Sequence, residues 1–325
     1  MRDAVRRWRD RLRRTDPAPC LPLSDAGVRA VWHTALDALH DDALDAAWAV
    51  PGTPVDTAAM AVAHHVFTAP IEWCAVLLGR GTRVLLKPPA DQPGLVPLLV
   101  AAAEAEGLPL SASPQRSALD AAELVVAMGS AETADRIRAE HARSTVLAFG
   151  HRFSAAWITR PESMLGVARD AALHDGRGCM SPVAVGTSLP LDVAVDALAE
   201  AMATVEAEIP RGSLEPTESA RLRARRALAL VAGTLREGTG WSVHGLPAER
   251  FVPSGLPRSL AVHPLADREA FVRWVEPWAS LLSTVGTDDP GLRLDAARVV
   301  GPGEMQRPPI LRLHDGVDWV RATVR

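Results

Sequence analysis

The residues with the clearest chemical potential lie in the segment 174–182, which reads His-Asp-Gly-Arg-Gly-Cys-Met-Ser-Pro. Gly176 and Gly178 come just before Cys179, and glycines let the backbone approach a ligand closely. They also leave neighbouring N–H groups able to face the oxyanion that develops when a carbonyl is attacked. A thiolate at Cys179 would therefore act as a nucleophile. The same segment fits a small buried thiol beside a turn, and it does not separate these two interpretations by itself.

Lys87 is the only lysine in a chain that contains thirty-four arginines and no tyrosine. Ammonium and guanidinium groups are not interchangeable. A single lysine among so many arginines therefore indicates a place that a guanidinium cannot fill. The alternative is a lysine at the exposed end of a strand, with no role in binding.

Short apolar runs alternate with helical stretches from residue 58 onward. The expected strands and helices are, in chain order, residues 59–67, 71–78, 84–86, 95–106, 124–128, 131–142 and 145–148. Repeated strand–helix–strand units predict a parallel sheet with helices on both faces. Ligands of such sheets bind beyond the carboxyl ends of the strands, where Lys87, Gly129, Ser130 and Gly150 are expected.

A second block begins near Pro161. Its clearest element is a helix over residues 191–209, whose apolar residues recur at steps of three and four and predict one buried stripe. Residues 211–226 are polar and indicate a surface excursion before an Arg-rich helix. Further strands are expected at residues 183–185, 241–244, 259–263, 283–285 and 310–313.

Composition limits the function classes. The 325 residues are 48% hydrophobic and 23% charged with net charge -4, which excludes a disordered chain and favours two domains or one large α/β unit. No basic field points to nucleic acid, and no apolar run approaches the roughly 18 to 20 residues of a membrane-spanning helix. Three widely spaced cysteines fit a reducing compartment, the cytoplasm. Cys20 and Cys74 are expected to be structural, and no histidine has the spacing of a metal site.

The N-terminus carries seven arginines within its first fourteen residues, together with Asp3 and Asp10. It lacks the apolar core of a secretory signal. The simplest interpretation is a solvated helix face. An organelle presequence and an arm that binds an anionic surface are the alternatives.

Three motifs in this order resemble the aldehyde dehydrogenase superfamily: Leu85-Leu86-Lys87-Pro88, Met128-Gly129-Ser130 and Gly176-Arg177-Gly178-Cys179. Three further segments are similar to the bacterial fatty acyl-CoA reductases that supply aldehyde for bioluminescence: Gly-Cys-Met-Ser-Pro, residues 282–286, and the tail 305–316. The resemblance covers residues 55–320. It implies an aldehyde dehydrogenase-like α/β fold with a parallel-sheet cofactor domain and an α/β catalytic domain, shortened at the N-terminus.

The resemblance implies that an acyl-CoA, or another acyl thioester, is reduced to an aldehyde through a covalent acyl-Cys179. A nicotinamide cofactor would supply the hydride. Lys87 would contact the adenosine ribose or its phosphate, and Gly129 and Ser130 would approach the cofactor's phosphates. His314 is a candidate general acid for release of aldehyde or thiol, since imidazole titrates near neutrality. A hydrogen-bonded structural histidine is the alternative.

Several positions depart from the family pattern. Ala148 replaces the glutamate that activates water in oxidising members, which favours exchange with a thiol over formation of an acid. Ala90 replaces a carboxylate that holds a ribose hydroxyl, so NADPH is favoured and NADH stays open. The oxyanion asparagine corresponds to Thr68 or Ala69, which puts catalytic efficiency in question. The last glycine of the phosphate loop is Ala134.

These patterns predict four regions: an N-terminal helical or linker region 1–54, a nicotinamide-cofactor domain 55–160, a catalytic domain 161–300 and a C-terminal return segment 301–325. The predicted function is reduction of an acyl thioester by NAD(P)H. Two alternatives stay open: an aldehyde or semialdehyde dehydrogenase working oxidatively, and a degenerate member that binds without turnover as a partner subunit. The acyl chain, its carrier, a homo-oligomer and an acyl-donor partner protein are also left open.

Overall fold

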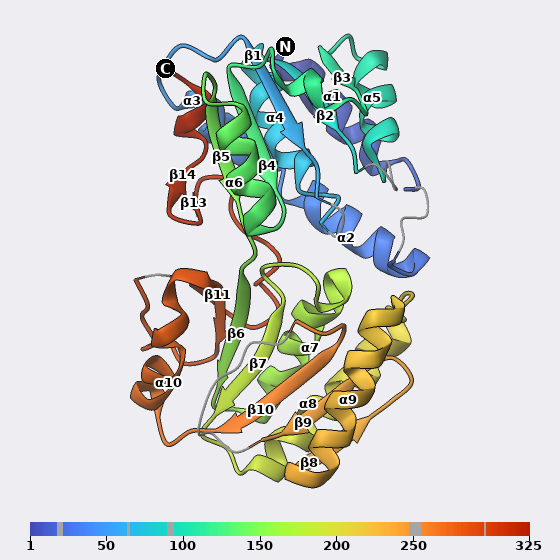
Figure 1. The fold of residues 1–325 in the computed structure, drawn as a ribbon, viewed down its shortest axis with the longest axis vertical. Helices are drawn as coiled ribbons and strands as arrows, with labels where there is room; N and C mark the ends of the chain where they lie inside the picture. Colours follow the sequence, from blue (N-terminus) through green and yellow to red (C-terminus); the bar gives the residue numbers. More distant parts are fainter. Residues whose placement is uncertain (18–21, 64–65, 90–93, 247–254, 296) are drawn as a thin grey trace. The chain divides into compact units, whose positions relative to one another are not determined.

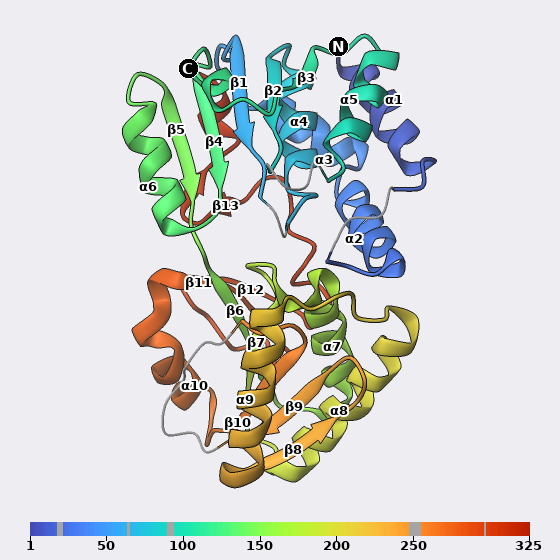
Figure 2. The same ribbon diagram turned by 45° about the vertical axis from the view of Figure 1, so that its right-hand side comes forward.

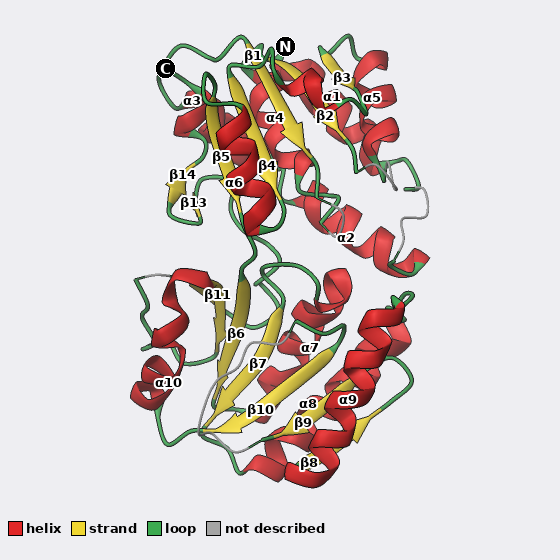
Figure 3. Cartoon of the chain, viewed as in Figure 1, coloured by secondary structure: helices red, strands yellow, loops and turns green. Residues whose placement is uncertain are grey.

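The structure, a computed structural model, describes residues 1–17, 22–63, 66–89, 94–246, 255–295 and 297–325. The chain forms two compact units, and Figure 3 shows their helices and strands. Unit 1 consists of Met1–Cys20, Val31–His151 and Arg307–Arg325, and unit 2 of Leu21–Ala30 and Arg152–Gln306. These bounds differ from the predicted domain ranges, because most of the N-terminal region and the end of the chain fold with the first sheet.

Unit 1 is built on a five-stranded sheet with the order β3-β2-β1-β4-β5, in which all neighbours are parallel. Its strands are β1 (Thr57–Ala61), β2 (Arg83–Lys87), β3 (Leu110–Ala112), β4 (Leu124–Met128) and β5 (Thr145–Phe149). Ala61 pairs with Lys87 on one side and with Ala127 on the other, so β2 and β4 end within one residue of each other. The predicted parallel sheet is confirmed.

The helices between these strands cover both faces of the sheet, and Figures 1 and 2 show α6 on the face opposite to α4. They are α4 (Pro70–Gly79), η1 (Arg116–Leu119), α5 (Val96–Ala105) and α6 (Ala131–Glu140). Every residue of α4 except Glu72 is buried, which explains why its sequence has no polar stripe. Pro70 occupies its first position, where the N–H would have no helical partner in any case.

The arginine-rich N-terminus forms α1 (Arg2–Arg13), and α2 (Asp25–Asp37) and α3 (Asp41–Ala49) follow. Helix α1 packs against α4 and α5 and buries apolar side chains at three- and four-residue steps: Val5, Trp8 and Leu12. On its polar side, Arg7 and Arg11 both bond to Glu106. The segment is therefore a helix, but one face of it belongs to the core of unit 1 rather than to solvent.

Unit 2 contains a seven-stranded sheet with the order β12-β11-β6-β7-β10-β9-β8. Within it β8 runs antiparallel to β9, and the other pairs are parallel. The strands are β6 (Phe153–Ile158), β7 (Pro182–Thr187), β8 (Thr234–Glu237), β9 (Ser242–Gly245), β10 (Ser259–Pro264), β11 (Leu282–Thr287) and β12 (Arg298–Val300). At Ser154 the register of β6 shifts against both neighbours. Such irregularities re-aim side chains.

Helices α7 (Met164–Ala172) and α8 (Leu191–Glu208) pack on one face of this sheet and α10 (Arg268–Val275) on the other. The predicted stripe of α8 is confirmed, since its buried residues include Val195, Leu198, Met202 and Val205. Helix α9 (Pro216–Ala232) packs on β8 and β9. The short 3-10 helices of this unit are η2 (Pro161–Ser163), η3 (Leu173–Gly176) and η4 (Glu276–Leu281).

The prediction of a strand at residues 310–313 is wrong. The carbonyl oxygen of Ile310 accepts the indole N–H of Trp319 and the N–H of Arg312, so the chain turns there. A two-residue strand, β13 (Leu313–His314), pairs with β14 (Val317–Asp318), and η5 (Arg321–Thr323) follows. None of the helices described here combines the length and the apolar character needed to cross a bilayer.

Candidate functional site

Cys179 and Met180 are the two central residues of a β-turn, because the N–H of Ser181 donates to the carbonyl oxygen of Gly178 at 3.0 Å. The turn immediately precedes β7, the central strand of the unit 2 sheet. Ser181 is fully buried, whereas Cys179 is half-buried. The fold therefore places the cysteine at a corner of the chain and not within a strand.

An unusual backbone leads into this turn. His174, Asp175 and Gly176 have φ angles of 58°, 53° and 74°, which lie in the left-handed region. Residues with a side chain enter this region rarely, and Asp and His are among those that do so most readily. A β-carbon at Gly176 would also lie 3.3 Å from the main-chain nitrogen of Arg258. The three residues turn the chain from the end of α7 toward Cys179.

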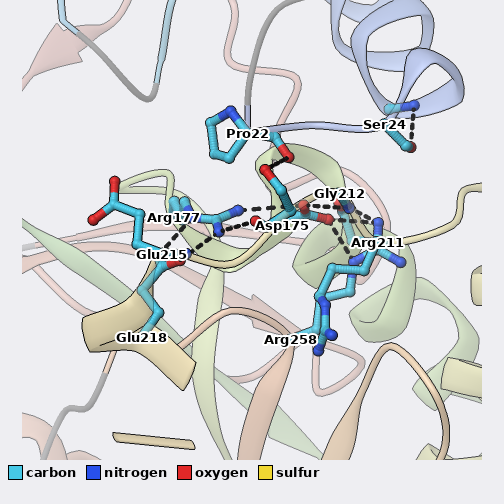
Figure 4. A network of polar contacts seen from close by, with 12 residues as sticks. Pro22, Ser24, Asp175, Arg177, Arg211, Gly212, Glu215, Glu218 and Arg258 are labelled. Atoms are coloured by element: carbon cyan, nitrogen blue, oxygen red, sulfur yellow. Dashed lines mark hydrogen bonds and ion pairs between the residues drawn. The ribbon is translucent and has the colours of Figure 1, made fainter. Parts of the chain in front are cut away.

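Asp175 is the centre of a buried polar network, shown in Figure 4. One of its carboxylate oxygens accepts a hydrogen bond from Arg258 at 2.7 Å. The other accepts bonds from Arg177 at 3.2 Å and from the N–H of Gly212 at 3.0 Å. Arg258 also bonds Glu206 at 2.7 Å. Buried charges are tolerated when they are paired and hydrogen-bonded, so the network holds the backbone before Cys179 in one conformation.

Arg177 connects the same segment to α9. Its guanidinium donates two hydrogen bonds to Glu218, both 2.8 Å long. Such two-pronged pairs are both strong and specific in geometry. Glu218 also completes a capping box with Glu215 at the start of α9. In the same region Ser213 donates its N–H to the carbonyl oxygen of Pro22 at 2.7 Å.

Two further side chains form hydrogen bonds to residues of the cysteine turn. The hydroxyl of Ser154 donates to the carbonyl oxygen of Cys179 at 2.8 Å and accepts the N–H of Thr284 at 3.1 Å. The amide nitrogen of Gln306 donates to the hydroxyl oxygen of Ser181 at 2.9 Å. Ser154 is fully buried and Gln306 nearly so. Buried polar groups thus hold the central carbonyl oxygen of the turn and the side chain of its last residue.

Asp170, on α7, ties down the segment that contains Gln306. Its carboxylate accepts the N–H groups of Gly303 at 2.6 Å and Met305 at 3.1 Å, and its carbonyl oxygen accepts Gln306 at 2.9 Å. Burial raises the pKa of Asp170 to about 7, although the N–H donors act in the opposite direction. The carboxylate therefore changes its charge near neutral pH.

In unit 1, Lys87 is the last residue of β2 and lies at the carboxyl edge of the sheet. Its ammonium group donates to the carbonyl oxygen of Pro88 at 3.0 Å. The strand order reverses beside β1, since β2 and β4 lie on its two sides. This reversal creates the switch point at which open parallel sheets bind nucleotides.

Gly129 and Ser130 follow β4 at that switch point. The N–H of Gly129 donates to the carbonyl oxygen of Phe149 at 3.1 Å. The hydroxyl of Ser130 caps α6 by accepting the N–H of Thr133 at 3.1 Å. A helix start directly after a strand and a glycine provides main-chain N–H groups for a phosphate.

His314 belongs to an aromatic cluster in unit 1. Its ring stacks on Phe149 with a centroid separation of 4.1 Å and an interplanar angle of 15°. Trp73 lies 6.5 Å from the His314 ring and 4.3 Å from Trp319, measured between ring centroids. Because the carbonyl oxygen of Phe149 holds Gly129, this cluster places His314 beside the carboxyl edge of the sheet.

Cys74 is fully buried in α4, and burial raises the pKa of its thiol. It is therefore unsuited to be a nucleophile. Cys20, Ala90 and the pair His64 and His65 lie outside the described residues. Among the residues that are described, no group of three or more His, Cys, Asp or Glu could hold a metal ion.

The predicted site residues fall into two groups. Lys87, Gly129, Ser130 and His314 share one edge of unit 1, and Cys179 belongs to unit 2. Sequence reasoning missed the side chains that hold the cysteine turn: Ser154, Asp170, Asp175, Arg258 and Gln306. Asp175 stood inside the motif and could have been noticed there. Gln306 stood inside the tail 305–316. No local signal marks the roles of Ser154, Asp170 and Arg258, because they depend on contacts formed only in the folded chain.

The fold is that of the aldehyde dehydrogenases. A γ-glutamyl-γ-aminobutyraldehyde dehydrogenase from Burkholderia cenocepacia is 14% identical with a TM-score of 0.69, and the match covers 92% of this chain and 75% of that one. Aldehyde dehydrogenase 21 from Physcomitrella patens, solved with succinate, is 12% identical with a TM-score of 0.71, and the match covers 99% and 83%. An NAD-dependent aldehyde dehydrogenase from Sinorhizobium meliloti is 14% identical with a TM-score of 0.68, and the match covers 93% of this chain and 72% of that one.

No curated protein matches the sequence. The sequence does match the family model described as "Acyl-CoA reductase (LuxC)" over residues 111–324. This range is more than half of the chain and includes the cysteine turn, β7 and the tail that carries His314. It confirms the resemblance drawn from the motifs. The chain belongs to the LuxC acyl-CoA reductase family, an oxidoreductase family of the aldehyde dehydrogenase type.

Proposed function

We propose that this protein reduces an acyl thioester, such as an acyl-CoA, to an aldehyde, with Cys179 as the nucleophile. The observation that carries the proposal is the position of Cys179 at the corner of a β-turn, in which buried polar groups hold the carbonyl oxygen of Cys179 and the hydroxyl of Ser181. A buried structural thiol needs no such support. Membership of the family adds the class of reaction.

The thiolate of Cys179 attacks the thioester carbonyl carbon. A new carbon–sulfur bond forms, and the π electron pair of the carbonyl moves to its oxygen. The oxyanion then collapses and expels the carrier's thiolate, which leaves an acyl-Cys179. This covalent step divides a difficult displacement into two easier ones.

A bound NAD(P)H would supply the hydride that reduces the acyl group. The carbon–oxygen double bond of the aldehyde then forms again from the alkoxide of the resulting hemithioacetal, the carbon–sulfur bond to Cys179 breaks, and the thiolate is restored. The one proton that the whole reaction consumes goes to the expelled carrier thiolate. We assign this proton transfer to His314, since histidine is the residue most often used as a general acid. Its place beside Phe149 and the edge of the unit 1 sheet supports this role.

The unit 1 sheet fits a nicotinamide dinucleotide. Its strand order reverses at β1, and the start of α6 directly after Gly129 and Ser130 offers main-chain N–H groups to phosphate. Space is also available, since a β-carbon at Gly129 would meet nothing nearer than Thr133 at 3.5 Å. Lys87, at the end of β2, lies level with Ala127 near the end of β4. It would hold the ribose or its phosphate. NADPH is the favoured form, on the sequence argument from Ala90.

The reductive direction follows from Ala148. This residue lies in β5 and has a methyl group where an oxidising enzyme needs a carboxylate to activate water. Its carbonyl oxygen is engaged by Arg138 at 2.7 Å. Without a base here, water attacks the acyl-enzyme slowly, so the acyl group persists long enough to be reduced.

The test is aldehyde formation from acyl-CoA substrates of several chain lengths with NADPH or NADH. The parent protein should release aldehyde and free CoA in equal amounts, and Cys179→Ala should abolish both. Cys74→Ala is the matched control, because it removes a thiol that is sealed inside α4, and it should keep the activity. Acid formation from aldehydes with NAD⁺ or NADP⁺, and no aldehyde from acyl-CoA, would contradict the proposal.

A further inference from the structure

We propose that the main-chain N–H of Met180 donates to the oxyanion formed at Cys179, and that Ser154 is the positioning residue that aims it. The inference rests on the proposed role of Cys179, but it concerns how the chain stabilises any carbonyl attacked by that sulfur. It starts from the peptide group that joins Cys179 to Met180.

This peptide group is the central one of the β-turn, and it is the part of a turn that can flip. The two common turn types differ mainly by rotation of this group through roughly 150°, with φ of the second central residue negative in one and positive in the other. Met180 is not among the non-glycine residues with positive φ in the described chain. The turn therefore has the orientation in which φ of its second central residue, Met180, is not positive.

Ser154 selects this orientation. Its hydroxyl donates to the carbonyl oxygen of Cys179 at 2.8 Å, and the same oxygen atom of Ser154 accepts the N–H of Thr284 at 3.1 Å. The sheet is irregular at this contact, since the register of β6 shifts at Ser154 against both β7 and β11. Bulges of this kind are a means of re-aiming a side chain near a functional site.

A planar trans peptide points its carbonyl oxygen and its N–H in opposite directions. Because the carbonyl oxygen of Cys179 is drawn to Ser154, the N–H of Met180 points away from the sheet. Two other N–H groups of the loop are used within it: that of Arg177 donates to the carbonyl oxygen of His174, and that of Ser181 to the carbonyl oxygen of Gly178. The N–H of Met180 donates to no residue that the structure describes.

A main-chain donor next to the attacking sulfur is well placed for catalysis. Its nitrogen is bonded to the carbonyl carbon of Cys179 itself, so it stays close to any group that becomes attached to the sulfur. A fixed donor needs no reorganisation as charge develops on the substrate oxygen. Gln306 completes the arrangement by holding Ser181, the last residue of the turn, at 2.9 Å.

The test compares two reactions of Cys179 in the full-length protein without cofactor. Acylation by p-nitrophenyl acetate passes through an oxyanion, whereas alkylation by iodoacetamide does not. Ser154→Ala should slow acylation tenfold or more and change alkylation less than threefold, since loss of an oxyanion donor typically costs about 100-fold or more. Ser154→Thr keeps a hydroxyl and should recover most of the acylation rate. Ser242→Ala removes another buried hydroxyl, on β9, and should leave the ratio of the two rates unchanged.

A second comparison does not touch Ser154. Met180→Gly frees the peptide to flip, because glycine enters the left-handed region readily, whereas Met180→Leu keeps the restraint. Acylation should be several-fold slower in the glycine variant than in the leucine variant, with similar alkylation. Equal acylation in this pair, or a parallel fall of both reactions in Ser154→Ala, would overturn the inference. The reaction of the parent protein with an acyl-CoA is measured separately. A protein that reacts with the ester but not with acyl-CoA would contradict the proposed function and leave this inference standing.

Discussion

Replacing Asp175 with asparagine should destabilise unit 2 and disorder the cysteine turn. The carboxylate of Asp175 is 1% exposed and receives hydrogen bonds from Arg258, Arg177 and the N–H of Gly212. Asparagine has the same size and enters the left-handed region as readily as aspartate, so the φ of 53° adds no new strain. The substitution therefore isolates the loss of the negative charge.

The magnitude follows from the burial of the pair. Arg258 is fully buried, and Glu206 is its remaining carboxylate partner. Breaking a buried ion pair by removing one partner costs about 3 to 5 kcal/mol. Because asparagine keeps one acceptor oxygen and Glu206 remains, we expect the lower end, about 3 kcal/mol. For a chain of this size that loss lowers the melting temperature by about 5 to 10 °C.

Urea unfolding followed by circular dichroism measures the loss, and Asp196→Asn is the matched control. Asp196 pairs with Arg236 at 2.8 Å, but both side chains are about half exposed, so that variant should lose less than about 0.5 kcal/mol. Iodoacetamide should also modify Cys179 at a different rate in the Asp175 variant. If Asp175→Asn were no more destabilising than Asp196→Asn, the account of the buried network would be refuted.

Three other substitutions test separate parts of the molecule. The pKa of Asp170 is raised to about 7, against about 3.8 in an unfolded chain. Between these two pH values the folded protein keeps a proton on Asp170 that the unfolded chain has released. Stability relative to Asp170→Asn should therefore fall as pH rises from about 4 to 7, by about 1.4 kcal/mol per pH unit, and urea unfolding across this range measures it; a constant difference would argue against it. Lys87→Ala should weaken cofactor binding in a fluorescence titration more than it slows acylation of Cys179, and unchanged cofactor affinity would refute its role. His314→Phe keeps a ring that can stack on Phe149, so melting should change little while aldehyde formation falls about 100-fold; full activity would exclude proton transfer by His314.

Four of the five strands of the first sheet were predictable because they are separated by clear turn residues, whereas β3 was missed and the strand expected at 59–67 ends at Ala61. The strand expected at residues 124–128 is β4 itself, and Lys87 and Gly129 lie at the carboxyl edge as expected. The second sheet was harder to read. Strand β6 was missed, since Ser154 interrupts its apolar run, and the same serine proves to be the residue that holds Cys179.

The candidate nucleophile and the candidate cofactor residues could be named from the sequence because each stands in a local motif. Their supporting residues could not, since the supports are far apart along the chain. Asp175 and Arg258 are 83 positions apart, and Ser181 and Gln306 are 125 apart. The error at residues 310–313 has a more local origin, because the indole N–H of Trp319 bonds the carbonyl oxygen of Ile310, nine positions before it.

Peptide mapping of the acylated protein tests the central claim most directly. The protein is mixed with an acyl-CoA in the absence of cofactor, digested with trypsin and analysed by mass spectrometry. The account predicts the acyl mass on the peptide that begins at Gly178 and ends at Arg211, which contains Cys179 as its only cysteine, and loss of that mass with release of aldehyde when NADPH is added. An acyl group on Cys74 or Cys20, or none on any cysteine, would contradict it.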